Sequence, residues 1–269
     1  MSGPVLSLLF FGDVVGKGGR KTVAAVLPRL KRKYNCQFAV VNAENCAAGA
    51  GLNQACLKEM PDADVFTTGD HVWDRKEFPL EIQGIRNVLR PANMSRSQPG
   101  RGWGCFRNPA GGDVAVISLL GKVFMKESAY CPFETAEEIL TQIPITCKCI
   151  LVDFHAEATS EKLAMAAFLD GKATAVLGTH THVQTADARI LPGGTAAITD
   201  VGMVGGADSI LGRDTQDVLK KFRTGMPVKL EVVEDRIRYD AVVIRYELNT
   251  GRAVSIVPVS EEYKPEEED

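Results

Sequence analysis

The chain has four histidines, and each lies in a short polar segment that follows an apolar run. His71 and His155 lie in separate segments, whereas His180 and His182 share the segment Gly178-Thr-His-Thr-His182. Short apolar runs rich in β-branched residues predict buried strands. Histidines placed directly after buried strands are typical of a ligand site at one edge of an α/β sheet.

Oxygen ligands occur in equivalent positions. Asp13 follows the apolar run Val5–Phe11, Glu44 and Asn45 follow Phe38–Val41, and Asp70 directly precedes His71. A mixed nitrogen and oxygen set differs from structural zinc sites, which favour cysteine in closed tetrahedra, and it suits iron or manganese better. The candidate ligands for two divalent ions are Asp13, Glu44, Asn45, Asp70, His155, His180 and His182.

Strands and helices are expected to alternate along most of the chain. This pattern predicts an α/β domain with buried, mostly parallel strands, in which ligands bind at the carboxyl ends of the strands. The expected strands are Val5–Phe11, Phe38–Val41, Asp64–Phe66, Val114–Leu119, Cys149–Phe154 and Ala173–Leu177. The expected helices are Gly19–Lys33, Gln54–Met60, Lys76–Gln83, Thr135–Ile143 and Ser160–Leu169.

The last of these helices has an apolar stripe, with Ser160 as its expected N-cap. The stripe consists of Leu163, Ala164, Ala167 and Phe168. Three further strands, expected to be antiparallel and to complete a second sheet, are Val228–Val233, Arg236–Arg245 and Ala253–Val257. We expect residues 1–260 to form a single domain and residues 261–269 to form an acidic tail.

Residues 90–112 are rich in Pro, Gly, Ser and Arg, and they predict a long surface loop. Arg96, Arg101 and Trp103 in this loop are candidates for holding a phosphate and stacking on a base, with Arg101 and Trp103 as the candidate substrate contacts. The alternative is a solvated connection in which the tryptophan is anchored in the core.

The charge and the apolar content exclude several classes of partner. The net charge of −3 gives no field that attracts nucleic acid, so we expect no stable nucleic-acid partner. No apolar run approaches the ~20 residues of a membrane helix. An odd count of seven cysteines without a secretory segment predicts reduced thiols and a cytoplasmic location. Homo-oligomers are common among soluble enzymes, but the sequence indicates no interface residue.

Each motif alone has a structural explanation, such as a turn for Gly12-Asp13 or a helix cap for Asn45. Their order and spacing together favour the metal site. Two glycine-rich motifs are excluded as nucleotide-binding loops. Gly12 to Lys17 has neither the glycine spacing of a phosphate loop nor the Ser or Thr that follows its lysine. Lys21 stands at the position where a dinucleotide-binding fingerprint needs its last glycine.

The ordered motifs resemble the calcineurin-like metallophosphoesterases and, more closely, the YmdB-type family of bacterial cyclic-nucleotide phosphodiesterases. The closer likeness covers most of the chain. It is carried by Gly12-Asp-Val-Val-Gly16, Asn42-Ala-Glu-Asn45, His71-Val-Trp-Asp74, Arg90-Pro-Ala-Asn93, Pro99-Gly-Arg-Gly102, residues 153–161, residues 178–187 and Thr199-Asp-Val-Gly-Met203.

The resemblance implies a four-layer α/β/β/α sandwich and a site for two metal ions. Asp13, Glu44, Asn45 and His182 would bind one ion, and Glu44, Asp70, His155 and His180 would bind the other. His71 would be the proton donor to the leaving oxygen. The family usually has Asn where this chain has Asp70, so one extra negative charge is expected at the site.

The implied activity is hydrolysis of cyclic mononucleotides. The 2′,3′-cyclic nucleotides are the leading candidate substrates, and the 3′,5′-cyclic nucleotides are the second candidates. A hydroxide bridging the metals would attack phosphorus while His71 acts as general acid. The alternatives are a phosphomonoesterase or nucleotidase with the same site, and a nucleotide-sensing protein whose site is weakened by Asp70.

Overall fold

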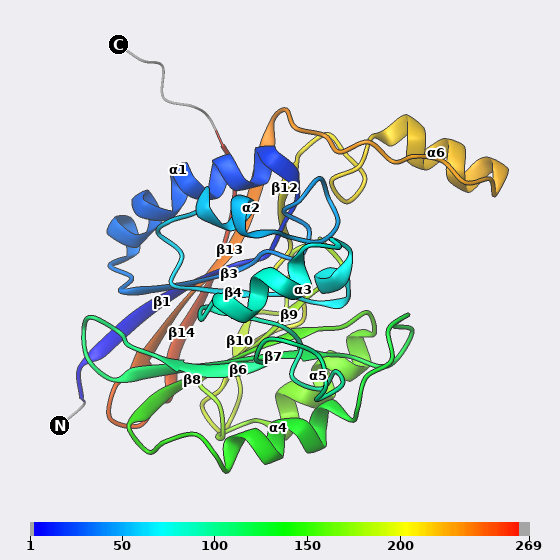
Figure 1. The fold of residues 1–269 in the computed structure, drawn as a ribbon. Helices are drawn as coiled ribbons and strands as arrows, with labels where there is room; N and C mark the ends of the chain where they lie inside the picture. The colour runs from blue at the N-terminus through cyan, green and yellow to red at the C-terminus, as the bar shows by residue number, and fades with distance from the viewer. Residues whose placement is uncertain (1–2, 264–269) are drawn as a thin grey trace.

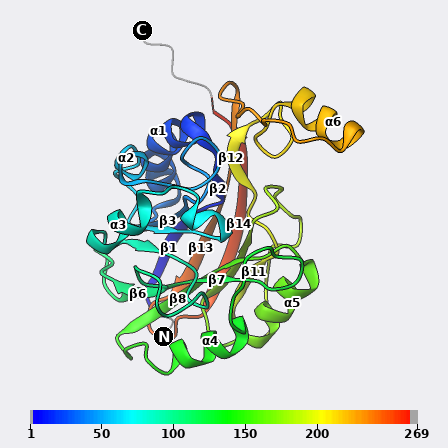
Figure 2. The same ribbon diagram turned by 45° about the vertical axis from the view of Figure 1, so that its right-hand side comes forward.

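Two mixed sheets lie face to face between two layers of helices, as Figures 1 and 2 show. The computed structural model describes residues 3–263. The first sheet has the order β2-β12-β13-β1-β3-β4-β5, with β14 also paired to β13. Its strands are β1 (Val5–Phe11), β2 (Asp13–Val14), β3 (Phe38–Asn42), β4 (Val65–Thr67), β5 (Val88–Leu89), β12 (Met203–Gly206), β13 (Ile237–Glu247) and β14 (Ala253–Glu262).

The second sheet has the order β10-β11-β9-β8-β7-β6. Strands β7, β8, β9 and β11 are parallel to one another, and β6 and β10 are antiparallel edge strands. The strands are β6 (Trp103–Phe106), β7 (Asp113–Leu120), β8 (Cys147–His155), β9 (Ala175–Thr179), β10 (Arg189–Ile190) and β11 (Ala196–Ile198).

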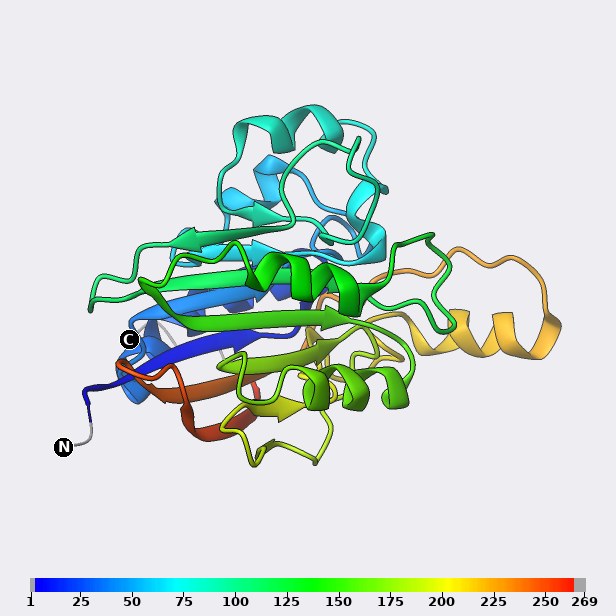
Figure 3. The same ribbon diagram turned by 90° about the horizontal axis from the view of Figure 1, so that it is seen from below.

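Helices cover the outer face of each sheet, and Figure 3 shows the layers from below. Against the first sheet lie α1 (Gly16–Tyr34), α2 (Gln54–Lys58), α3 (Phe78–Glu81) and the 3₁₀ turns Asp70–Trp73 and Ile82–Gly84. Against the second sheet lie α4 (Pro132–Leu140) and α5 (Thr159–Phe168).

Successive side chains of a strand point to opposite faces of the sheet, and this alternation explains the layers. In β1, Leu9 packs in the cluster beneath α1, whereas Phe10 packs in the cluster between the sheets. In β8, Leu151 belongs to the cluster between the sheets and Phe154 to the cluster beneath α4 and α5. Three apolar clusters separate four layers, so the expected α/β/β/α sandwich is confirmed.

Several expected elements differ from the structure. Arg236–Arg245 and Ala253–Val257 do become strands, but they extend the first sheet through β1 and do not build the second. Val228–Val233 forms only an isolated bridge at Val232, so a strand there was wrong. The expected loop 90–112 contains β6, because its residues pair with β7.

The apolar stripe of α5 was also assigned to the wrong face. Leu163, Ala164 and Ala167 are exposed, and the buried residues of the helix are Glu161, Lys162, Met165 and Ala166. Phe168 is the one residue of the stripe that packs, partly buried, against the core. The N-cap is Ala158 and makes no side-chain hydrogen bond, so Ser160 does not cap the helix. Buried charges that bind neighbouring loops determine this face, and a hydrophobic pattern does not detect them.

Residues 208–233 form an arm that stands away from the two sheets and carries α6 (Thr215–Thr224), as Figures 1 and 2 show. The sequence pattern had not indicated this helix. At the other end of the chain, β14 continues through Glu262, two residues into the expected acidic tail, and residues 264–269 lie outside the described part.

Within residues 3–263, no helix is both long enough and apolar enough to cross a bilayer. The cytoplasmic location stays a prediction.

Candidate metal centre

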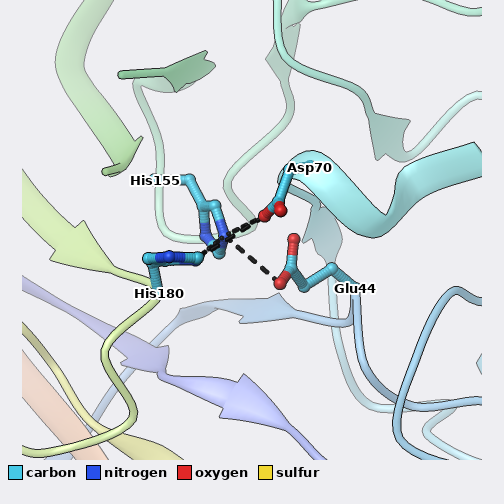
Figure 4. Close-up of side chains that lie close together, drawn as sticks. All are labelled: Glu44, Asp70, His155 and His180. Carbon is cyan, nitrogen blue, oxygen red and sulfur yellow. Dashed lines mark hydrogen bonds and ion pairs between the residues drawn. The ribbon is translucent and has the colours of Figure 1, made fainter. Parts of the chain in front are cut away.

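The candidate centre lies where strands of both sheets end. Glu44 follows β3, Asp70 follows β4, His155 is the last residue of β8 and His180 follows β9. These strands are parallel within each sheet, so their carboxyl ends bring the four side chains to one place. Figure 4 shows the four side chains pointing toward one another.

His155 Nε2 is the centre of the cluster. It lies 3.0 Å from His180 Nδ1, 3.1 Å from Asp70 Oδ1 and 3.2 Å from Glu44 Oε1. One ligand atom from each of these four residues lies within 4.8 Å of all the others. Four of the seven predicted ligands therefore converge directly.

The hydrogen bonds of His155 show that Nδ1 is a donor and that Nε2 faces the cluster. The Thr179 hydroxyl donates to Asp153 Oδ1 over 2.7 Å, so it accepts from His155 Nδ1 over 2.9 Å. With a cation bound in the cluster, a neutral ring that keeps its proton on Nδ1 would present the Nε2 lone pair on the side of the two carboxylates. That arrangement suits a bound cation, because metal-binding histidines typically donate the N–H of the other ring nitrogen to a hydrogen-bond acceptor.

Two buried oxygens in the centre have no hydrogen-bond partner among the described residues: Asp13 Oδ1 and Glu44 Oε2. Buried carboxylate oxygens are costly unless they are paired or bind a metal. Gly69 keeps the space open, because a Cβ there would overlap Glu44 Oε2 and the His155 ring. The residues therefore fit a metal ion by donor type and by space.

The pKa values of the buried groups are shifted by burial and by their charged neighbours. Burial disfavours a charged ring at His155, but Glu44, Asp70 and Asp13 outweigh it and raise the pKa well above its usual value. Burial and the neighbouring His155 lower the pKa of His180 to about 4. Burial, with Glu44 and Asp200 nearby, raises the pKa of Asp13.

The other three predicted ligands surround the cluster. Asp13 Oδ1 lies 3.7 Å from His155 Nδ1, and Asp13 Oδ2 accepts from the His180 backbone N–H over 3.0 Å. Asn45 Nδ2 donates to Glu44 Oε1 over 2.9 Å. His182 makes its hydrogen bond outside the cluster, from Nδ1 to the Leu211 carbonyl over 3.2 Å.

His71 lies beside the cluster and does not belong to it. Its Nδ1 is 2.8 Å from Asp74 Oδ2, and its side chain is 39% exposed. Burial disfavours the charged ring, but the carboxylates of Glu44, Asp70 and Asp74 outweigh it and raise the pKa of His71. A ring that holds its proton at the rim of the cluster has the properties of a proton donor.

The loop that carries His180 and His182 adopts an unusual backbone conformation. Both histidines have positive φ, 102° and 62°, a conformation that non-glycine residues keep only where surrounding contacts enforce it. The contacts come from Asp200, whose Oδ2 accepts from the Thr181 N–H and hydroxyl and from Lys162 Nζ.

Sequence reasoning missed these supporting residues: Asp153, Thr179, Asp200 and Lys162. A signal for Asp153 was present, since a lone carboxylate in the apolar run before His155 shares the same strand face, two residues away. No local pattern relates Lys162 to Asp200, which are distant in the sequence.

The structure does not bring Arg101 or Trp103 to the cluster through any contact of the described residues. Arg101 is exposed and lines a cavity with Ile82 and Arg86. Trp103 pairs with Ile117 in the second sheet and lines a separate cavity of about 620 Å³ beside α4.

Known proteins are similar to this chain over most of its length. The model of the YmdB-like protein family matches residues 9–259, nearly the whole chain. The chain belongs to the YmdB-like family. A 2′,3′-cyclic-nucleotide 2′-phosphodiesterase of Bacillus subtilis is 45% identical over 253 residues, which is 93% of this chain and 95% of that protein.

Solved structures of similar proteins confirm the fold of this YmdB-like chain. A novel phosphatase from Mycoplasma pneumoniae superposes with a TM-score of 0.90 at 32% identity, covering 98% of this chain and 96% of that one. A hypothetical protein from Thermus thermophilus gives a TM-score of 0.89 at 35% identity, covering 96% of this chain and 100% of that one. The family resemblance expected from the motifs is therefore confirmed.

Proposed function

We propose that this YmdB-like protein is a dinuclear-metal phosphodiesterase that hydrolyses cyclic mononucleotides, 2′,3′-cyclic ones first. The observation that carries the proposal is the convergence of Glu44, Asp70, His155 and His180, which bring two imidazole nitrogens and two carboxylate oxygens within 4.8 Å of one another. The substrate class is supported by the activity for which the Bacillus subtilis relative is named.

One ion would be held by Asp13, Glu44, Asn45 and His182, and the other by Glu44, Asp70, His155 and His180. Bound divalent ions supply an activated water and neutralise charge on the phosphate. The mixed nitrogen and oxygen donors favour iron or manganese. Glu44 suits a shared position, because Asn45 and His155 already approach one of its oxygens and the other is unpartnered.

His71 would complete the reaction by giving a proton to the departing oxygen. Asp74 orients the ring through Nδ1, which leaves Nε2 as the atom that delivers the proton. Protonation of the leaving group avoids an unstable alkoxide and contributes roughly 10²–10⁴-fold in rate in general acid catalysis. Arg101 and Trp103 stay candidates for contact with the substrate, although each lines a cavity that none of the seven candidate metal ligands lines.

A comparison of substrates tests the proposal. The protein is purified anaerobically, reconstituted with manganese or iron(II), and assayed on 2′,3′-cyclic AMP and on p-nitrophenyl phosphate. Faster cleavage of the cyclic ester supports the phosphodiesterase. Faster cleavage of the monoester moves the protein to the phosphatase class, and metal-bound protein without turnover on either substrate contradicts both.

A further inference from the structure

The base of the arm contacts two loops of the candidate metal centre. The Leu211 carbonyl accepts from His182 Nδ1 over 3.2 Å. Arg213, two residues later, donates from Nη2 to the Gly49 carbonyl. The arm therefore connects the loop after β9 to the loop after β3, and Figures 1 and 2 show it leaving the body of the protein beyond these contacts.

The Leu211 carbonyl determines which nitrogen of His182 is free. A carbonyl can only accept, so Nδ1 must carry the ring proton and Nε2 keeps its lone pair. A backbone carbonyl in this role is a common way to fix the tautomer and orientation of a metal-binding histidine. The direction of this one carbonyl thus sets the donor atom of His182.

The turn that ends at Arg213 fixes the direction of that carbonyl, and the Arg213 side chain anchors the turn. The Arg213 N–H donates to the Ile210 carbonyl over 3.0 Å, and the Ile210 N–H donates to the Arg213 carbonyl over 2.9 Å. These two bonds close a tight turn around Leu211 and Gly212. Leu211 has a φ of 54° in this turn, a left-handed conformation that a leucine does not adopt without restraint. Arg213 also pairs with Val232 on the returning part of the arm.

The side chain of Arg213 restrains the second loop. The Gly49 N–H donates to the Asn45 carbonyl over 3.0 Å, so the Gly49 carbonyl and Asn45 belong to one turn. Nη1 of the same guanidinium donates to the Leu230 carbonyl over 3.2 Å. The guanidinium lies directly against Gly49, where a Cβ would be 2.6 Å from Cζ.

We propose that Arg213 is a positioning residue that holds Asn45 and His182 together for one of the two metal ions. The inference rests on the proposed dinuclear function, in which Asn45 and His182 belong to the same ion. The other ion uses Asp70, His155 and His180, which Arg213 does not contact. Loss of the guanidinium should therefore weaken one ion selectively.

Metal titration of the metal-free protein tests this. We expect two manganese equivalents in the wild type, and in Arg213→Met one unchanged equivalent and one bound roughly 10–100-fold more weakly. Arg213→Lys, which keeps the charge and one donor group, should lie between them. The matched control is Arg236→Met, which removes an exposed guanidinium that pairs with Asp208 and Glu262 near the root of the arm; it should bind metal like the wild type.

Two results would overturn the role of Arg213: unchanged binding of both equivalents in Arg213→Met, or equal weakening of both, which indicates a general effect on the fold. Nitrogen-15 NMR of the metal-free protein gives a second readout, since four histidines are readily resolved. His182 should be protonated on Nδ1 in the wild type. In Arg213→Met the turn keeps its backbone hydrogen bonds but loses its anchors on Gly49 and Leu230, so the Leu211 carbonyl should move from His182 and that preference should be lost. A wild type with fewer than two equivalents contradicts the proposed function instead, and the NMR result still decides the role of Arg213.

Discussion

Replacing Lys162 with methionine should lower the free energy of unfolding by about 3 kcal/mol. Lys162 Nζ lies 2.7 Å from Asp200 Oδ2, and the two side chains are only 4% and 1% exposed. Removing one partner of a buried pair typically costs about 3–5 kcal/mol, because the other charge stays buried. We take the lower end, since Asp200 keeps donors from Thr181 and from the Gly202 N–H.

Urea denaturation of the wild type and of Lys162→Met measures this difference. The slope of the unfolding free energy against urea concentration should be the same for both proteins, which shows that the unfolded state is unchanged. The control is Arg96→Met, which breaks a pair with Glu138 whose side chains are 83% and 59% exposed. That change should cost less than about 1 kcal/mol, as exposed pairs do. If Lys162→Met were as mild as Arg96→Met, the buried pair would not stabilise the histidine loop as we describe.

Three further predictions concern the centre itself. His71→Ala should keep its metals and lose roughly 10²–10⁴-fold in turnover of cyclic esters, measured by metal analysis and kcat; equal loss of metal would make His71 a ligand. Asp70→Asn removes one negative charge and should change the metal preference or the rate, and an inactive, metal-free variant would contradict the tolerance we expect. Thr179→Val deprives His155 Nδ1 of its acceptor and should weaken metal binding by roughly 10–100-fold in a titration, whereas unchanged affinity would show that the hydroxyl does not orient the ring.

The sequence was sufficient where function depends on residues that directly follow a strand. Glu44, Asp70, His155 and His180 each follow or end a parallel strand, so the topology of the sheets brings them together. The apolar runs that precede these residues are long enough to be recognised as strands.

The sequence was insufficient to predict the buried face of a helix where charged residues are buried at positions that a hydrophobic pattern assigns to apolar residues. On α5, Lys162 and Glu161 face inward because Asp200 and the backbone N–H groups of Lys122 and Val123 bind them. These partners are distant in the chain, so the apolar stripe of the helix indicates the opposite face.

Pairing between strands that are distant in the sequence could not be predicted either. β13 follows the arm in the chain, yet it inserts between β12 and β1, because its apolar residues such as Val243 face α1 while Val242 faces the second sheet. Local alternation predicted that the segment is a strand, but it contains no information about which sheet it joins. The arm escaped prediction although α6 has a short apolar stripe of Val218, Leu219 and Phe222, and only Val218 of these three is buried.

The most direct test of the central claim is the rate of 2′,3′-cyclic AMP hydrolysis as metal-free protein is titrated with manganese or iron(II). The account predicts that activity is absent without metal and reaches its maximum at two equivalents per chain. Full activity in metal-free protein, or a maximum reached at one equivalent, would contradict a dinuclear centre built from Asp13, Glu44 and the histidine loop.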